Sequence, residues 1–383
     1  MSSFENFQKF TMDLFLEEVT SRMKNKRIRT YCDILFAYPN AFDALPRILD
    51  YYSDRRRSRW TVTISQCAEK DFYIVSFFPK ETTSKQKPVF FFWKILRDDH
   101  YVTILSFSLH SFGEIRKSLD SLVRFVRGFW FAWIGSQFLI NLDSFVEQEL
   151  GPETQVLASF QTVVGEDKSR TRKMRVYPLP PRQFVPLEEI RKWTRESYFE
   201  KSEILTFTNM RYRIVSRQNG MQFTFSMTNR SRITFERGDF TLFVALLRPL
   251  FLETRRVLNI LRRKSYTTKS ESTVMGKSIE IRSFDLIESL VFKKPKGQEK
   301  WYDNVVSLFS ADIPQERLVS FVLMSGNPYF LVHIIDIENS SSVYLSATSE
   351  ELQLVPAGIS TKEGTITKIV DLLQTKVDPS ISI

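Results

Sequence analysis

The chain has 383 residues, and its 43% of hydrophobic residues is enough apolar material for two or three folded domains. With 12 glycines and 15 prolines it is not a disordered or linker-rich chain, and its 34 phenylalanines favour β-strands with large buried areas. The net charge of +10 is uneven: residues 1–163 carry +2, residues 164–264 carry +12 and residues 265–383 carry −4. This concentration of positive charge indicates a polyanion site in the middle segment.

Cysteine usage and hydropathy suggest a compartment. Cys32 and Cys67 cannot build a disulfide framework or a zinc site of four ligands, so we expect buried thiols in a reducing environment. Residues 1–15 lack the basic start and apolar run of a secretory signal, and the apolar stretch 129–140 is shorter than the roughly 20 residues that span a bilayer. The sequence predicts an intracellular protein of the nucleus or cytoplasm, with no membrane span and no cofactor.

The first two segments differ in their predicted secondary structure. Residues 1–53 are expected to form an N-terminal helical segment, and residues 54–163 a first ββββα unit. Its strands are predicted at 60–65, 72–78, 89–96 and 101–109, followed by a helix that ends at Gly128. The run 89–96 is apolar on both sides, so its aromatic residues are either packed in a core or form a stacking platform.

Residues 164–264 are expected to contain a basic linker and a second ββββα unit. Strands are predicted at 204–208, 211–216, 221–227 and 232–236, with a tight turn at Asn219-Gly220 and a helix that begins after Asp239. The linker, up to Pro181, is read as an exposed and extended connector. Its basic residues are Lys168, Arg170, Arg172, Lys173 and Arg175.

Residues 265–383 are expected to form a third ββββα unit after a polar stretch that runs to Lys277. Strands are predicted at 318–324, 329–337, 343–346 and 352–355, with a closing helix at 361–374. Its net charge of −4 argues against independent nucleic-acid binding and favours a homodimer or protein-partner role. The predicted fold class is α+β, with repeated ββββα units of antiparallel sheets backed by helices.

The middle unit offers a candidate binding face. Alternation in 221–227 places Phe223 and Phe225 on one side and Gln222, Thr224 and Ser226 on the other. If neighbouring strands pair in register, the polar side also includes Arg211, Arg213 and Arg232. Arginine contacts phosphates bidentately and stacks on bases, which favours single-stranded nucleic acid. An ordinary solvated sheet face is the alternative.

This middle unit resembles a PUR repeat. The matching stretches are Arg211–Ile214, Arg217–Gly220, Phe223 and Ser231–Thr234, although the arginine expected next to the glycine is missing because Met221 follows Gly220. Four antiparallel strands followed by a helix resemble the fold shared by PUR-alpha-type proteins, the Whirly transcription factors and the PC4 coactivator. The resemblance implies binding of single-stranded DNA or RNA through the sheet face and pairwise packing of units. It also implies nucleic-acid contacts by Arg217, Gln218 and Asn219.

The sequence carries no recognisable enzyme motif, so we expect a non-enzymatic binding protein. The candidate nucleic-acid-binding residues are Lys168, Arg170, Arg172, Lys173, Arg175, Arg211, Arg213, Arg217, Gln218, Asn219, Gln222, Thr224, Arg230 and Arg232. One alternative is a protein-interaction or scaffold module for an acidic partner or an anionic surface. A second is a divergent metal-dependent nuclease that uses Asp336 and Glu338, which share one strand face; a strand edge before a Ser-rich turn explains that pair more simply.

Overall fold

The computed structural model divides into two compact units. Unit 1 consists of Met1–Ala132, Ser231–Val244 and Thr268–Ser283, and unit 2 of Trp133–Arg230, Ala245–Thr267 and Phe284–Ile383. The domain boundaries expected after residues 53, 163 and 264 stay predictions. The residues that the structure describes are 9–26, 29–54, 59–80, 88–98, 101–108, 112–126, 128–166, 173–175, 184–193, 204–216, 220–262, 265–274, 277–286, 290–294, 300–314, 316–326, 328–339, 341–357, 361, 363–378 and 381.

Unit 1 is built on an antiparallel sheet whose first strands follow one another along the chain. These are β2 (Trp60–Gln66), β3 (Phe72–Pro79), β4 (Val89–Arg97) and β5 (Val102–Ser108), and α5 (Phe112–Phe125) comes after them. From β5 the sheet continues to β1 (Thr30–Ala37) and β12 (Arg232–Gly238), and β6 (Phe129–Phe131) also pairs with β1. The four predicted strands and the helix after them are confirmed.

The expected helical segment at residues 1–53 is wrong where β1 lies. α2 (Met12–Lys26), α3 (Pro39–Asp43) and α4 (Leu45–Asp54) are helices, but β1 pairs with β5 on one side and β12 on the other. Ile34 and Leu35 are both fully buried, so apolar residues follow one another instead of alternating. A short apolar run fits a buried helix as well as a central strand, and only the long-range pairing decides between them.

Aromatic side chains fill the core of unit 1. The ring of Phe15 in α2 lies 4.8 Å from that of Phe92 and 5.6 Å from that of Phe107. On the other side of β4, Phe91 and Trp93 are buried as well. One face of β4 is buried, and on the other Phe92 is buried while Phe90 and Lys94 are half-buried and Leu96 is exposed. Of the two alternatives left by the sequence, core packing is the one observed for Phe91, Phe92 and Trp93.

The first part of unit 2 is a second group of paired strands. The order is β11 (Gln222–Thr228), β10 (Ile204–Ser216), β7 (Thr154–Glu166) and β8 (Lys173–Arg175), with β9 (Val185–Pro186) also paired to β7. The strands expected at 204–208 and 211–216 form one continuous β10, whose register with β7 shifts around Asn209. α6 (Ser136–Ile140) contacts β10, and α7 (Leu142–Leu150) contacts β7. The buried Tyr212 donates its hydroxyl to the main-chain oxygen of Leu139 at 2.8 Å.

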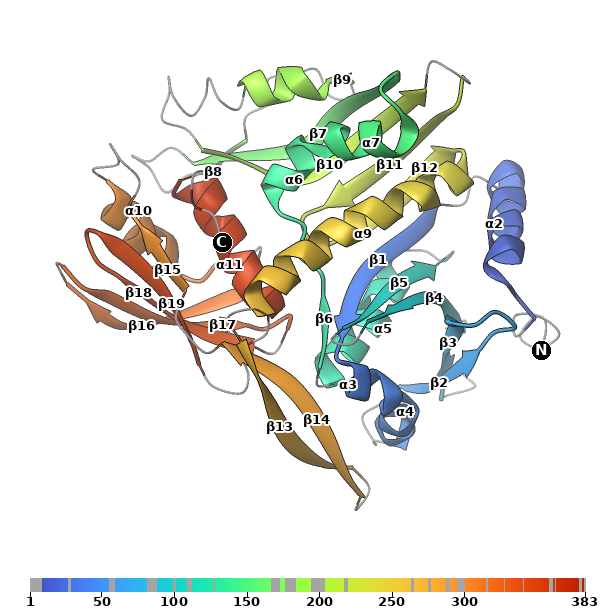
Figure 1. The fold of residues 1–383 in the computed structure, drawn as a ribbon, viewed down its shortest axis with the longest axis horizontal. Helices are drawn as coiled ribbons and strands as arrows, with labels where there is room; N and C mark the ends of the chain where they lie inside the picture. Colours follow the sequence, from blue (N-terminus) through green and yellow to red (C-terminus); the bar gives the residue numbers. More distant parts are fainter. Residues whose placement is uncertain are drawn as a thin grey trace. The chain divides into compact units, whose positions relative to one another are not determined.

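The second part of unit 2 is a five-stranded antiparallel sheet. Its order is β15 (Leu290–Lys293), β19 (Glu351–Pro356), β18 (Ser341–Ala347), β17 (Phe330–Asp336) and β16 (Leu318–Ser325). α10 (Trp301–Phe309) and α11 (Glu363–Lys376) pack against β18 and share one apolar core with it (Figure 1). The four strands and the helix predicted between residues 318 and 374 are confirmed.

Three further elements complete the chain. α9 (Phe240–Arg262) begins where the sequence predicts, since the Asp239 carboxylate accepts a hydrogen bond from the Leu242 N–H at 3.0 Å. The polar stretch up to Lys277 contains β13 (Ser265–Val274), which pairs with β14 (Lys277–Leu286). No helix among the described residues is long and apolar enough to cross a membrane. The predicted mixed α+β fold with antiparallel sheets is confirmed.

Candidate nucleic-acid interface

One face of β10 and β11 collects polar side chains. Arg211 pairs with Ser226 and Arg213 pairs with Thr224, so the two strands lie in the register that the predicted face requires. Between the two arginines, Tyr212 points to the opposite face and is fully buried. The alternation of β10 and β11 therefore places the predicted arginines and hydroxyls on one side of the sheet.

An aromatic ring lies against both arginines of this face. Phe184 comes directly before β9, which pairs with β7, the neighbour of β10. Its ring centroid is 4.2 Å from Cζ of Arg213 and 5.2 Å from Cζ of Arg211. A guanidinium within about 6 Å of a ring centroid is attracted by the ring quadrupole. Arg211, Arg213 and Phe184 are all partly exposed, and we call them the Arg–Phe cluster.

The other polar residues of the face differ in accessibility. Gln222 is exposed and Ser226 is partly exposed. Thr224 is only 2% exposed, so its hydroxyl is closed off from an outside ligand. Gly220 has a φ of 65°, in the left-handed region that the predicted Asn-Gly turn requires. Among the described residues of β10 and β11, the accessible part of the predicted face is Arg211, Arg213, Gln222 and Ser226, with Phe184 beside the two arginines.

Arg232 belongs to unit 1 and has acidic partners there. Its Nη2 lies 2.9 Å from Oδ1 of Asp120 and its Nε 3.6 Å from Oδ1 of Asp33. The guanidinium also lies over the ring of Phe131, and the residue is 8% exposed. In this arrangement Arg232 neutralises buried carboxylates, and its charge is not presented to an outside ligand. Local sequence pattern could not predict these contacts, because Asp33 and Asp120 come from distant segments.

Arg230, in unit 2, also faces a carboxylate. Its Nη2 lies 3.6 Å from Oε2 of Glu316, which is 4% exposed. Burial raises the pKa of the Glu316 carboxyl above the usual 4.5, although the charges of Arg230 and Lys368 act in the opposite direction. Arg230 therefore has an internal carboxylate within ion-pair distance. It is a weaker candidate for nucleic-acid binding than the arginines of β10.

The side chains of the other predicted nucleic-acid-binding residues are not described by the structure. Lys168, Arg170, Arg172, Arg217, Gln218 and Asn219 lie outside the described residues. Lys173 and Arg175 are in β8, where they pair with Glu166 and Val164 of β7. The basic connector thus contains a short strand next to the group that carries the Arg–Phe cluster.

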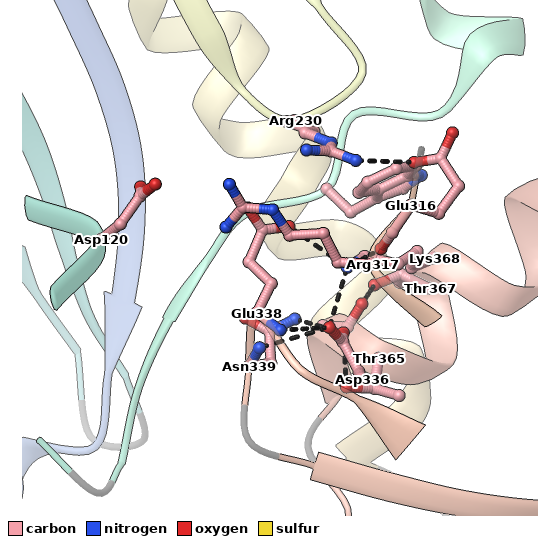
Figure 2. Close-up of polar contacts among 12 residues, drawn as sticks. Asp120, Arg230, Glu316, Arg317, Asp336, Glu338, Asn339, Thr365, Thr367 and Lys368 are labelled. Carbon is pink, nitrogen blue, oxygen red and sulfur yellow. Dashed lines mark hydrogen bonds and ion pairs between the residues drawn. The ribbon is translucent and has the colours of Figure 1, made fainter. Parts of the chain in front are cut away.

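A second concentration of charge is buried in unit 2 around Lys368 of α11. Its Nζ, on a residue that is 1% exposed, lies 3.0 Å from Oδ1 of Asp336 and 3.2 Å from Oε2 of Glu338 (Figure 2). It also donates to the main-chain oxygen of Glu316 at 3.2 Å and lies 5.2 Å from the ring centroid of Trp133. The ammonium is thus surrounded by internal acceptors.

This network occupies the two carboxylates that suggested a nuclease. Asp336 accepts the N–H groups of Glu338 and Asn339, the side-chain amide of Asn339 and the hydroxyl of Thr365, in addition to the Lys368 ammonium. Figure 2 shows these groups gathered around Asp336. Among the described residues, no group of three or more His, Cys, Asp or Glu side chains is arranged to hold a metal ion. The geometry is that of a buried structural ion pair.

Lys368 is not among the predicted residues, because the apolar stripe of the closing helix indicates only the face that packs in the core. Thr365, Lys368, Asp371 and Thr375 form a second stripe at helical spacing, and all four are buried. Asp371 accepts the indole N–H of Trp133 at 2.8 Å, and α11 contacts both β10 and α6. This polar stripe on the face opposite the apolar one is the sequence signal that α11 is buried on both faces.

Comparison with known proteins identifies no relative. No protein-family model, no curated protein and no solved structure matches the chain.

Proposed function

We propose that this protein binds single-stranded nucleic acid, DNA or RNA, without turnover, and that the Arg–Phe cluster is the centre of its binding surface. The observation that carries the proposal is the pair of arginines on one sheet face, each partly exposed as a residue and each with its guanidinium against the ring of Phe184. Guanidinium groups bind phosphate bidentately and can stack on unpaired bases. A duplex hides the faces of its bases, so this chemistry favours a single strand.

The surroundings of the cluster support a polyanion. Residues 164–264 carry a net charge of +12, and β8, with Lys173 and Arg175, pairs with the strand next to β10. Gln222 and Ser226 add neutral hydrogen-bonding groups on the same face. The proposal therefore includes the connector and turn residues Lys168, Arg170, Arg172, Arg217, Gln218 and Asn219 as flanking contacts.

The repeated ββββα plan and its likeness to the PUR, Whirly and PC4 group form part of the same proposal. Four consecutive strands and a helix occur from β2 to α5 and again from β16 to α11. The middle segment has the shorter order β10, β11, β12 and α9. Under this proposal, the protein acts inside the cell, in the nucleus or cytoplasm, where its two free cysteines, Cys32 and Cys67, remain reduced.

The test is a binding survey with the full-length chain, freed of co-purifying nucleic acid by nuclease and high salt. We expect labelled oligo-dT or oligo-rU to bind more tightly than a duplex of equal length in fluorescence anisotropy. Arg211→Ala and Arg213→Ala should each lower this affinity about 10- to 100-fold, since a hydrogen bond to a charged group contributes about 1.5–3 kcal/mol. Arg237→Ala is the matched control, because Arg237 is an exposed arginine of the same basic segment.

Three results would overturn the proposal. Equal affinity for single strands and duplex would remove the single-strand preference. An unchanged affinity of both β10 variants would remove the site. Tighter binding of an acidic peptide or of anionic vesicles than of any oligonucleotide, lost in the same variants, would identify the cluster as a protein or surface contact instead.

A further inference from the structure

Two glutamines lie on either side of β10, close to the Arg–Phe cluster. The register pairs Val215 with Gln155 of β7 and with Gln222 of β11. Residues directly opposite one another share a face, so both glutamines lie on the face of Arg211 and Arg213, with Val215 between them. Gln222 is exposed, and Gln155 and Val215 are partly exposed. Within the part of the chain that the structure describes, neither amide has a hydrogen-bond partner. We call Gln155 and Gln222 the glutamine pair.

The spacing of the glutamine pair suits a flat ring. Neighbouring strands are about 4.8 Å apart, so the Cα atoms of the two residues, one strand apart from β10 on each side, are separated by about 10 Å. Two flexible side chains that start at this distance can hold a nucleobase between them, with the Val215 side chain beneath it. Each amide offers a carbonyl acceptor next to an NH2 donor. A ligand that satisfies both amides therefore needs a donor and an acceptor side by side on two of its edges.

Adenine carries this pattern on two edges. Its N6 amino group lies between N1 and N7 and donates one hydrogen toward each of them. One amide can accept from N6 and donate to N1, while the other accepts the second N6 hydrogen and donates to N7. Guanine has the acceptor O6 in place of the amino group, which leaves one amide carbonyl facing an acceptor. Cytosine and thymine have a carbon where adenine has N7, so they satisfy only one amide.

We propose that the glutamine pair is a base-reading subsite that selects adenine in the single strand bound at the Arg–Phe cluster. This inference rests on the proposed function, because it adds base specificity to the same face. Arg213 is two residues before Val215 in β10, about 7 Å away along the strand. One nucleotide spans such a distance between its phosphate and its base. Arg213 thus holds the phosphate while the two amides bond the base.

The test uses oligo-dT probes of one length that differ only at the central base. In fluorescence anisotropy with the nuclease-treated, full-length protein, the probe with a central dA should bind about tenfold more tightly than oligo-dT, since a bidentate amide–adenine pair discriminates by about that factor. Probes with a central dC or dG should stay close to the oligo-dT value. A central 7-deaza-dA, which has a carbon in place of N7, should lose most of the gain. This last probe requires no protein variant.

Two variants assign the preference to the glutamine pair. Gln155→Leu and Gln222→Leu each remove one amide with little change in volume, and each should lower the ratio of dA-probe affinity to oligo-dT affinity about three- to tenfold. A variant that only binds every strand less tightly leaves this ratio unchanged. Gln353→Leu is the matched control, because Gln353 is a partly exposed glutamine on β19 of the C-terminal sheet. It should keep the wild-type ratio.

The outcomes separate this inference from the proposed function. Equal affinity of the wild-type protein for the dA, 7-deaza-dA and oligo-dT probes would overturn the adenine subsite and leave single-strand binding in place. A preference for dA that persists in both variants, folded by circular dichroism, would overturn its assignment to the glutamine pair. Failure of every probe to bind would overturn the proposed function and this inference with it.

Discussion

Basic residues of the middle segment have two different environments. Arg230 and Arg232 lie beside buried or nearly buried carboxylates, those of Glu316, Asp33 and Asp120. Arg211 and Arg213 lie against the ring of Phe184 and are partly exposed. All four contribute equally to the charge of the segment, and the proposal assigns contact with an outside anion to the second pair.

The difference shows why net charge locates a binding surface only approximately. Acidic residues from remote parts of the chain can neutralise a basic segment after folding, as Asp33 and Asp120 do for Arg232. Lys368 is the extreme case, since it is 1% exposed between Asp336 and Glu338. Substitutions in the carboxylate-paired group should therefore change stability, and substitutions in the Arg–Phe cluster should change binding.

The largest effect is expected for Lys368→Ala. It leaves the buried carboxylates of Asp336 and Glu338 without their cation, which should lower the free energy of unfolding by about 3–5 kcal/mol. Urea denaturation followed by circular dichroism measures this. Lys293→Ala, an exposed cation of the same sheet, is the control and should stay within about 0.5 kcal/mol of wild type. An equally small loss for Lys368→Ala would contradict a buried ion pair.

Arg232→Ala should have the next largest effect. It removes a charge-assisted contact to Asp120 and leaves a nearly buried acid, so we expect a loss of about 1.5–3 kcal/mol in unfolding free energy. The folded variant should bind oligo-dT as tightly as wild type does. A large loss of affinity without a loss of stability would place Arg232 with the binding residues and remove the distinction between the two groups.

Phe184→Ala should change binding more than stability. Without the ring, Arg211 and Arg213 lose their cation–π contacts, which contribute about 0.5–1 kcal/mol at exposed sites, so affinity for oligo-dT should fall about two- to fivefold. Phe184→Tyr keeps the aromatic face and should restore the wild-type affinity. If alanine and tyrosine behave alike, the ring does not position the arginines.

The smallest effect concerns Glu316, the partner of Arg230. Burial raises its pKa in the folded state, so the folded protein binds this proton more tightly than the unfolded chain does. Its contribution to stability is therefore lost as pH rises above the usual carboxyl value of 4.5. Glu316→Gln should remove that decline when unfolding free energies are compared across pH. Parallel pH curves for the two proteins would contradict the raised pKa.

Much of the fold could be predicted from alternation and from short runs of β-branched and aromatic residues between polar breaks. β17, β18 and β19 alternate buried and less buried residues at strand spacing, whereas β4 and β5 are largely buried without alternation and were placed by composition and by the polar breaks around them. β1 was not predicted, because it lies between helical segments, where the buried pair Ile34 and Leu35 fits a helix as well as a strand. Its identity depends on pairing with β5 and β12.

The candidate site was predictable to a similar degree. Alternation placed Arg211 and Arg213 on one face with Gln222 and Ser226, which the register confirms. Phe184 could not be assigned to that face from the sequence, because its position depends on the pairing of β9 with β7. The acidic partners of Arg232 could not be foreseen either, since tertiary contacts between distant segments leave no local pattern.

The salt dependence of binding by the double variant Arg211→Ala/Arg213→Ala tests the central claim most directly. For single strands, the slope of log affinity against log salt changes by about 0.7 for each phosphate contact, so the double variant should lose about 1.4 of the wild-type slope. Arg237→Ala should keep the wild-type slope. A double variant with the wild-type slope and affinity would contradict the claim that the Arg–Phe cluster binds nucleic acid.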